Sequence, residues 1–503
     1  MTAVRVAFIL YAGAAIALGW RAYRRTRGRA DSDGAGNEFW TAGRELDGWS
    51  VGLSMSAGFM SVSWSCVYAV QLFYWYGLGA LWLITIPWLL SLTGIYLLAR
   101  RYHGLAAFSQ PEMVGQRFGV LGRRTVAVAL GLVFLVWGGA EIYVAATLLS
   151  PEMGLSPEAM IVLISAVVGV YATLGGFRAV VATDKLQYAL VALYILAMGW
   201  LAARGLGTLG RGLPSGLVTG TKSAVGWPQL FSPGLVLIAL TFLAYLPGWL
   251  FETDLWLRVQ AARNAGAARK GVALAGLNAL VFVGILPLFI GVAALALFPV
   301  EGGAYPAAVG REGDAIFAAL VAAFAPGWLA VLVAAGLVAA AMSTIDTAAN
   351  VMALGVSYDL LETRRDARGQ GPQLATAGAV LAATLFALNI ESLWDLFYLS
   401  SGVLTTAVAF PVAAVFLPWA NARGVRWSAL AGLVGIMLAY VLETRGPLTG
   451  WEPGWLAESG LGFILWGLLS AAVGYGLGTL WDLTQARQGP AQREAVEAGA
   501  ETS

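Results

Sequence analysis

The stretch "AAAMSTIDTAAN", residues 339–350, carries four polar side chains inside a long run of Ala, Val, Leu and Gly: Ser343, Thr344, Asp346 and Thr347. The run is apolar enough to lie in a membrane. An aspartate near the bilayer centre costs roughly 2.5–3.5 kcal/mol on insertion scales. A polar cluster at that cost favours a functional site within a membrane-spanning helix.

The composition is typical of a polytopic membrane protein. Of 503 residues, 59% are hydrophobic and 12% are charged, and the formal net charge is +2. This charge is too small to indicate nucleic-acid binding. The chain has one cysteine, Cys66, and one histidine, His103, so it can form neither an internal disulfide nor a Cys/His metal site. No catalytic cluster is evident, and we do not expect an enzyme.

Apolar runs of about 20 residues, the length that spans a bilayer, recur along the chain. They lie near residues 4–20, 49–72, 78–99, 125–150, 158–174, 185–203, 232–256, 272–298, 315–357, 373–390, 392–418, 427–444 and 460–481. The runs do not alternate as barrel strands do, so helices must satisfy their backbone groups. The sequence predicts an all-α protein of about 13 transmembrane helices, with one domain over residues 1–484 and a polar cytoplasmic tail over residues 485–503.

The basic residues predict the orientation, because Lys and Arg accumulate in cytoplasmic loops. With the N-terminus outside, the segments that become cytoplasmic carry 24 of the 30 Lys and Arg residues. The cluster "RAYRRTRGR", residues 21–29, follows the first apolar run, whereas a secretory signal has its charge before the run. We expect a retained first helix and a multi-pass protein of the cell (inner) membrane, with its C-terminus in the cytoplasm.

Two of the runs contain helix-breaking residues. "LSMSAGFMSVSW", residues 53–64, crowds Ser and Gly together, and "LAYLPGWLFETD", residues 243–254, contains Pro247 and Gly248. The two runs are five spans apart, as the first helices of two inverted five-helix repeats would be, and this favours a binding site at the midplane. The alternative is a pair of packing kinks.

The chain resembles the sodium/solute symporter family over nearly its whole length. The matching stretches are "GREL" (43–46), "LSMSAGFMS" (53–61), "PEMVGQRFG" (111–119), "YATLGGFRAVVATDKLQ" (171–187), "AARNAGAARKG" (261–271) and "AAAMSTIDTAAN". The resemblance implies an LeuT-like core of two inverted repeats and a co-transported sodium ion. The repeats would occupy about 48–203 and 232–418, between a leading helix at 4–20 and trailing helices at 427–481.

The resemblance also implies where sodium binds. The shared sodium site of the family falls on Ala57, Met60, Ala340, Ser343 and Thr344. Sodium is a hard cation that prefers about five oxygen ligands, which freed backbone carbonyls and hydroxyls would supply. The alternative is that the two hydroxyls bond back to carbonyls of their own helix.

A second cation site is predicted between Asp184 and the helix that carries Ser343. Its candidate residues are Asp184, Ser343, Asp346 and Thr347. The last three share one helical face. Some family members use the residue matching Asp184 with this face to hold an additional sodium ion, but they carry hydroxyls where this chain has Asp346 and Thr347. The alternative is a helix cap or an ion pair of Asp184 with Lys185 or Arg178.

The substrate pocket is expected between the second, fourth, seventh and eleventh spans, which the resemblance implies. Candidate side chains on them are Gly58, Phe59, Ser63, Trp137, Glu141, Tyr143, Tyr245, Trp249, Trp394, Tyr398 and Ser401. For the aromatic residues, the alternative is packing or the interfacial belt. Glu141 lies in mid-span and would either bind a substrate amine or pair internally. Phe59 stands where the proline-transporting branch carries a functional aspartate, which argues against proline.

Three charged residues follow the second break. Glu252 and Asp254 precede Arg258 by six and four residues. We expect them at the cytoplasmic end of the seventh span, as a surface ion pair.

The predicted function is sodium-coupled symport, in which a small polar organic solute is imported by alternating access. The partners expected are that solute, sodium and the lipid bilayer, with no nucleic acid, and the protein is expected to function as a monomer. The alternative is a transporter-like solute sensor that acts through a separate signalling partner.

Overall fold

The computed structural model describes residues 3–28, 42–105, 107, 109–213, 220–223, 229–361, 371–390, 392–448 and 450–500. Helices make up nearly all of this part of the chain, and its two isolated β-bridges join Leu46 to Ala262 and Glu301 to Ala304. The predicted all-α class is therefore confirmed.

The helices of the first half of the chain are α1 (Ala3–Gly28), η1 (Ala42–Arg44), α3 (Gly48–Phe59), η2 (Val62–Tyr68), α4 (Ala69–Tyr76), η3 (Gly77–Trp82), α5 (Thr85–Gly104), α6 (Gln110–Phe118), α7 (Val120–Met153), α8 (Pro157–Thr208), η4 (Gln229–Phe231), α9 (Leu235–Leu250) and α10 (Thr253–Ala261). Those of the second half are α11 (Ala265–Ala279), η5 (Leu280–Ile285), α12 (Leu286–Leu297), η6 (Ala307–Val309), α13 (Ile316–Phe324), α14 (Leu329–Leu354), η7 (Gly355–Leu360), α15 (Gly371–Ala387), α16 (Leu393–Val403), η8 (Leu404–Ala409), α17 (Phe410–Ala414), α18 (Ala422–Thr444), α19 (Gly454–Ala457) and α20 (Gly462–Ala500).

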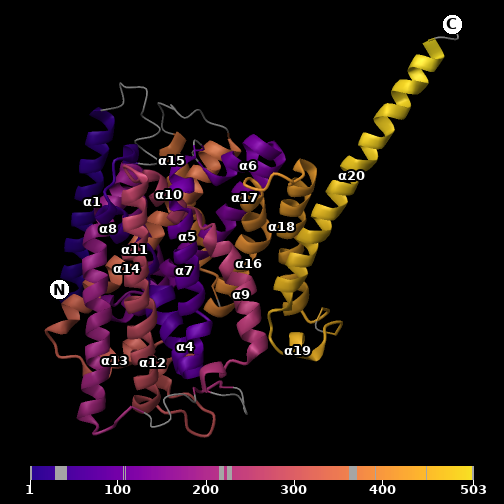
Figure 1. Cartoon of the computed structure of the whole chain (residues 1–503). Helices are drawn as coiled ribbons and strands as arrows, with labels where there is room; N and C mark the ends of the chain where they lie inside the picture. The colour runs from indigo at the N-terminus through magenta and orange to yellow at the C-terminus, as the bar shows by residue number, and fades with distance from the viewer. Residues whose placement is uncertain are drawn as a thin grey trace.

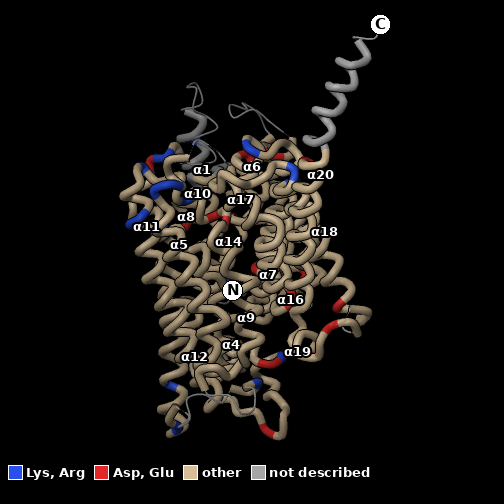
Figure 2. The backbone as a smooth tube through the Cα atoms, turned by 45° about the vertical axis from the view of Figure 1, so that its right-hand side comes forward, with Lys and Arg blue, Asp and Glu red and all other residues tan. Residues whose placement is uncertain are grey.

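The helices form one upright bundle around α14. This helix packs against α7, α8 and α15, while α3 packs against α8 and α11. Helices α1 and α8 lie together at one edge of the bundle, and α18 and α20 lie together at the opposite edge (Figure 1). Charged residues gather at the two ends, and the band between them is mostly uncharged (Figure 2). This distribution is what a bilayer requires, because a charge in the hydrocarbon region is costly.

The number of spanning helices differs from the prediction. In the described part of the chain, nine helices are long and apolar enough to cross a membrane, or ten if one bent pair counts as a span. The thirteen predicted runs are not all separate helices. Those near 158–174 and 185–203 both belong to α8, and the run near 373–390 forms α15, which has only 17 residues. Hydropathy locates apolar segments, but it does not show whether a helix ends between two of them.

The first predicted break is present. Helix α3 and the following helical segment over Val62–Trp82 are bent by 60°. Asp47 caps the start of α3 by accepting a hydrogen bond from the Ser50 amide at 2.7 Å. Ser61 caps η2 in the same way, with its hydroxyl oxygen 3.0 Å from the Trp64 amide. This span is therefore divided by a second helix start, at Val62, which follows the first one at Gly48.

The second break lies later than predicted. Pro247 and Gly248 lie inside α9, which continues to Leu250, and the chain leaves the helical conformation at Phe251 and Glu252. The Thr405 hydroxyl of η8 explains why α9 continues. It accepts from the Gly248 amide at 3.0 Å and donates to the Ala244 carbonyl at 2.6 Å, so it replaces one hydrogen bond of the helix.

Candidate functional site

The broken ends of α3 and η2 are held by one buried carboxylate. Glu141 of α7 is 1% exposed and accepts hydrogen bonds from the amides of Val62 and Ser63, each at 3.1 Å. The Ser63 hydroxyl donates to it as well, at 2.6 Å. In a continuous helix the two amides would bond to the carbonyls of Gly58 and Phe59. Glu141 therefore caps the second half of the span, which favours the internal-pairing interpretation of this residue.

The carbonyls released by the break receive hydroxyl groups instead. The Ser343 hydroxyl of α14 donates to the Ala57 carbonyl at 2.9 Å, and the Thr344 hydroxyl donates to the Gly58 carbonyl at 3.0 Å. The Phe59 carbonyl accepts from a serine of its own span, Ser65, at 2.6 Å. Helix α14 thus contacts the broken span through two adjacent hydroxyls.

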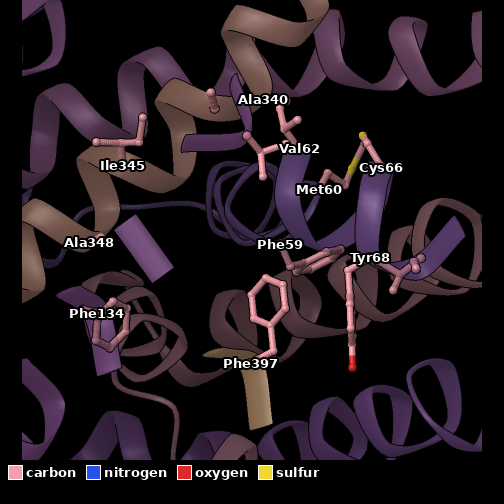
Figure 3. Close-up of a cluster of buried hydrophobic side chains, with 14 of the residues drawn as sticks. Phe59, Met60, Val62, Cys66, Tyr68, Phe134, Ala340, Ile345, Ala348 and Phe397 are labelled. Atoms are coloured by element: carbon pink, nitrogen blue, oxygen red, sulfur yellow. The ribbon is translucent and has the colours of Figure 1, made fainter. Parts of the chain in front are cut away.

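Three oxygen atoms converge at Ser343. Its hydroxyl lies 2.9 Å from the Ala57 carbonyl and 2.8 Å from the Ala340 carbonyl of its own helix. A single hydroxyl hydrogen cannot fully satisfy both carbonyls, whereas a cation can be coordinated by all three oxygens at once. Met60 is the cap residue at the end of α3, and Figure 3 draws it as part of the buried hydrophobic cluster that also contains Ala340. The structure therefore brings three of the five predicted sodium ligands together, Ala57 of α3 with Ala340 and Ser343 of α14.

A buried arginine contacts the predicted second cation site. Arg258 of α10 is fully buried, and its Nη2 lies 3.0 Å from Thr347 Oγ1 and 3.4 Å from Asp184 Oδ2. Its Nη1 pairs with Asp254 Oδ2 at 2.9 Å, and its Nε donates to Ser54 Oγ at 2.9 Å. The surface ion pair expected for Asp254 and Arg258 is wrong, because both side chains lie inside the bundle.

The two acidic residues of that predicted site have different partners. Asp184 faces Arg258 rather than Lys185, which is exposed on the same helix, and the Arg178 side chain lies outside the described part of the chain. Asp346 Oδ2 accepts from the Tyr171 hydroxyl at 2.8 Å. The Arg258 guanidinium therefore already provides a positive charge beside Asp184 and Thr347, two of the four residues predicted for the second cation site. A second sodium ion at this place stays a prediction.

A pocket lies next to the break, with a cavity volume of about 70 Å³. Seven of the predicted substrate residues line it: Gly58, Phe59, Ser63, Trp137, Glu141, Trp249 and Ser401. So does Thr344 of the predicted sodium site. Seven further residues that were not predicted from the sequence also line the pocket: Ser61, Trp64, Trp88, Glu252, Asp254, Leu255 and Phe397. Several of these directly follow the two helix breaks, and that position was the signal that could have identified them.

The other four predicted residues lie outside this pocket. Tyr143 and Trp394 line a separate cavity of about 890 Å³, the vestibule, which α4, α7 and residues 310–315 border. Tyr245 and Tyr398 stack on each other, with ring centroids 4.9 Å apart, and line neither cavity.

Aromatic rings separate the pocket from the vestibule. Tyr68 stacks on Trp64 of the pocket at 5.3 Å and contacts Phe397 of the pocket at 5.0 Å. On its other side it contacts Trp394 of the vestibule at 6.2 Å. Figure 3 shows Phe59, Tyr68 and Phe397 gathered beside the break. This aromatic layer, formed by Trp64, Tyr68, Trp394 and Phe397, closes the pocket toward the vestibule.

Comparisons with known proteins agree with this arrangement. The model of the "Sodium:solute symporter family" matches residues 39–432. The mouse protein "Sodium/glucose cotransporter 4" is 26% identical over 497 residues, covering 87% of this chain and 68% of the relative. The human "Sodium/myo-inositol cotransporter 2" is 25% identical over 382 residues, covering 67% of this chain and 55% of the relative.

Solved structures share the fold. A Na⁺-coupled sialic acid symporter, solved in a substrate-bound outward-open state, aligns with a TM-score of 0.70 at 16% identity, covering 95% of this chain and 98% of its own. The transporter MhsT in complex with L-phenylalanine aligns with a TM-score of 0.53 at 13% identity, covering 86% and 97%. These neighbours are transporters of the LeuT-like fold. At such low identity the likeness concerns the fold alone.

Proposed function

Because the chain belongs to the sodium:solute symporter family, we propose that it is a sodium-coupled symporter that imports a small polar organic solute by alternating access. Members of this family are sodium-coupled transporters rather than enzymes. The observation that carries the proposal is the contact of Ser343 and Thr344 with carbonyls at the break of α3.

The proposed first sodium site consists of the carbonyls of Ala57, Met60 and Ala340 and the hydroxyls of Ser343 and Thr344. The distances between the Ser343 hydroxyl and two of these carbonyls support it. An ion at this place would attach α14 to the broken span, which also lines the pocket through Gly58 and Phe59. Sodium binding and solute binding would therefore stabilise the same arrangement of helices, and this linkage couples the two.

The position of the pocket supports alternating access. The aromatic layer closes it toward the vestibule, and Glu252, Asp254 and Leu255 line it toward α10. We propose that the end of the bundle with α6 and α10 faces the cytoplasm, because the segments predicted to be cytoplasmic carry most Lys and Arg residues. The vestibule would then face outward, and the N-terminus would lie outside.

For the predicted second cation site we propose that Arg258 supplies the positive charge. Its contacts with Asp184 and Thr347 support this assignment. A second sodium ion near Asp346 remains the alternative, since Asp346 Oδ1 has no hydrogen-bond partner among the described residues.

Uptake into proteoliposomes tests the proposed function. A symporter accumulates solute against its gradient when sodium is higher outside than inside, and it stops when the sodium gradient is removed. A channel only equilibrates the solute, and a sensor moves little of it. A panel of amino acids, sugars, carboxylates and amines identifies the solute class. Sodium-independent equilibration of every accepted solute would refute the proposal.

A further inference from the structure

We infer that the transported solute is a small organic cation that carries an ammonium group. This inference rests on the proposed function and names the substrate class of the same pocket. Three of the described residues that line the pocket are acidic: Glu141, Glu252 and Asp254. The described lining contains no Lys, Arg or His. A cavity lined by one sign of charge attracts ligands of the opposite sign.

Two of these carboxylates, Glu252 and Asp254, lie close enough for their side chains to interact with each other, and each has one oxygen atom that receives no donor from the described residues. Glu252 is 7% exposed, and its Oε2 has no hydrogen-bond partner among the described residues. Asp254 pairs with Arg258 through Oδ2, while its Oδ1 has no partner in the same part of the chain. A buried carboxylate oxygen without a partner is costly, and a bound cation would remove that cost.

The groups that could hold an anion are already engaged. The amides at the start of η2, on Val62 and Ser63, are the natural anion site of a broken helix, and Glu141 accepts from both. The nearest guanidinium, that of Arg258, contacts Asp254, Asp184, Ser54 and Thr347 and does not line the pocket. A substrate carboxylate would have to displace one of these internal partners.

Aromatic rings form much of the wall. Five rings make a chain of edge-to-face contacts in the order Phe59, Trp88, Trp249, Trp64 and Phe397, with centroid distances of 5.7, 5.0, 5.3 and 5.0 Å. Their planes meet at 75° to 87°, so successive rings present faces in different directions. Such a cage binds an ammonium group through the negative faces of the rings.

The size of the pocket favours a small ligand. A buried water needs roughly 10–15 Å³ of cavity volume, so about 70 Å³ leaves room for about five to seven water-sized groups. A tetramethylammonium group has this size, whereas a hexose has more than twice as many non-hydrogen atoms. The Trp88 indole N–H has no partner among the described residues and offers one donor to an oxygen on the solute.

The test compares two probes of nearly equal shape, choline and its uncharged carbon analogue 3,3-dimethyl-1-butanol. Tryptophan fluorescence and thermal melting of the purified full-length protein report binding, in sodium and with sodium replaced by potassium. We expect saturable choline binding, strengthened by sodium and at least about ten-fold tighter than binding of the alcohol, as for loss of a charged contact.

Matched variants locate the effect. Glu252→Gln keeps the shape of the side chain and should weaken choline binding about ten-fold or more, while the melting shift caused by sodium alone is retained. Glu158→Gln, an exposed carboxylate in the first turn of α8, is the control. Trp249→Phe should retain binding and Trp249→Leu should lose it, because only the first keeps a ring face.

The outcomes separate this inference from the proposed function. Equal binding of both probes, or no choline binding by a protein that responds to sodium, would overturn the inference and leave sodium symport intact. Unchanged choline affinity in Glu252→Gln would also overturn it. Choline binding with the expected charge preference but no response to sodium would support the inference and count against sodium coupling.

Discussion

Replacing Ser343 by Ala removes the hydroxyl oxygen that lies 2.9 Å from the Ala57 carbonyl and 2.8 Å from the Ala340 carbonyl. In the proposed site this oxygen is one of about five sodium ligands. A contact with a charged group contributes roughly 1.5–3 kcal/mol. Since 1.4 kcal/mol corresponds to a factor of ten, sodium affinity should fall about ten- to hundred-fold. The apparent solute affinity should fall with it, because binding linkage is reciprocal.

The assay is the sodium dependence of uptake in proteoliposomes, together with the sodium dependence of the melting temperature of the purified protein. Ser91→Ala is the matched control, because Ser91 is equally buried and its hydroxyl bonds, among the described residues, only to the Pro87 carbonyl of its own helix α5, at 2.9 Å. If Ser343 also served only its own helix, the two variants would behave alike. Sodium activation that is the same in Ser343→Ala, Ser91→Ala and wild type would refute the assignment.

Three further substitutions test other parts of the structure. Thr405→Val leaves the Gly248 amide and the Ala244 carbonyl without their bridging hydroxyl, so the protein should be destabilised by about 1–3 kcal/mol and melt at a lower temperature. An unchanged melting temperature would show that this hydroxyl does not stabilise α9. If Arg258 supplies the charge at the second cation site, sodium activates wild-type uptake with a Hill coefficient near one. A coefficient above one that falls in Asp346→Asn would show a second ion instead. Asp47→Ala should destabilise the start of α3 by about 0.5–2 kcal/mol. The Ser50 hydrogen bonds lower the pKa of Asp47. The stabilisation by this cap is therefore fully present above the ordinary pKa of about 4 and is lost as the pH falls below that value. The difference in melting temperature between wild type and Asp47→Ala should accordingly shrink in acid.

Much of the fold was predictable because it depends on local patterns. Apolar runs of spanning length require helices in a membrane, and the run of Ser and Gly over residues 53–64 marked the first break. The motif around Ser343, through its family resemblance, also predicted the contact with Ala57. Where local patterns were ambiguous the predictions failed, as at Pro247, which a hydroxyl from a distant segment keeps inside α9.

By itself, then, the sequence determined an all-helical membrane protein with a broken span and a hydroxyl pair facing it. The tertiary structure alone decided which group satisfies each buried polar atom. Glu141 caps amides 79 and 78 residues away, and Arg258 pairs with Asp184 across 74 residues. Spacing along a chain predicts contacts within a helix, where neighbours are three or four residues apart. Between helices the partner depends on how the bundle packs. A buried charge takes whichever opposite group the packing brings within reach, because remaining unpaired in the bundle is more costly.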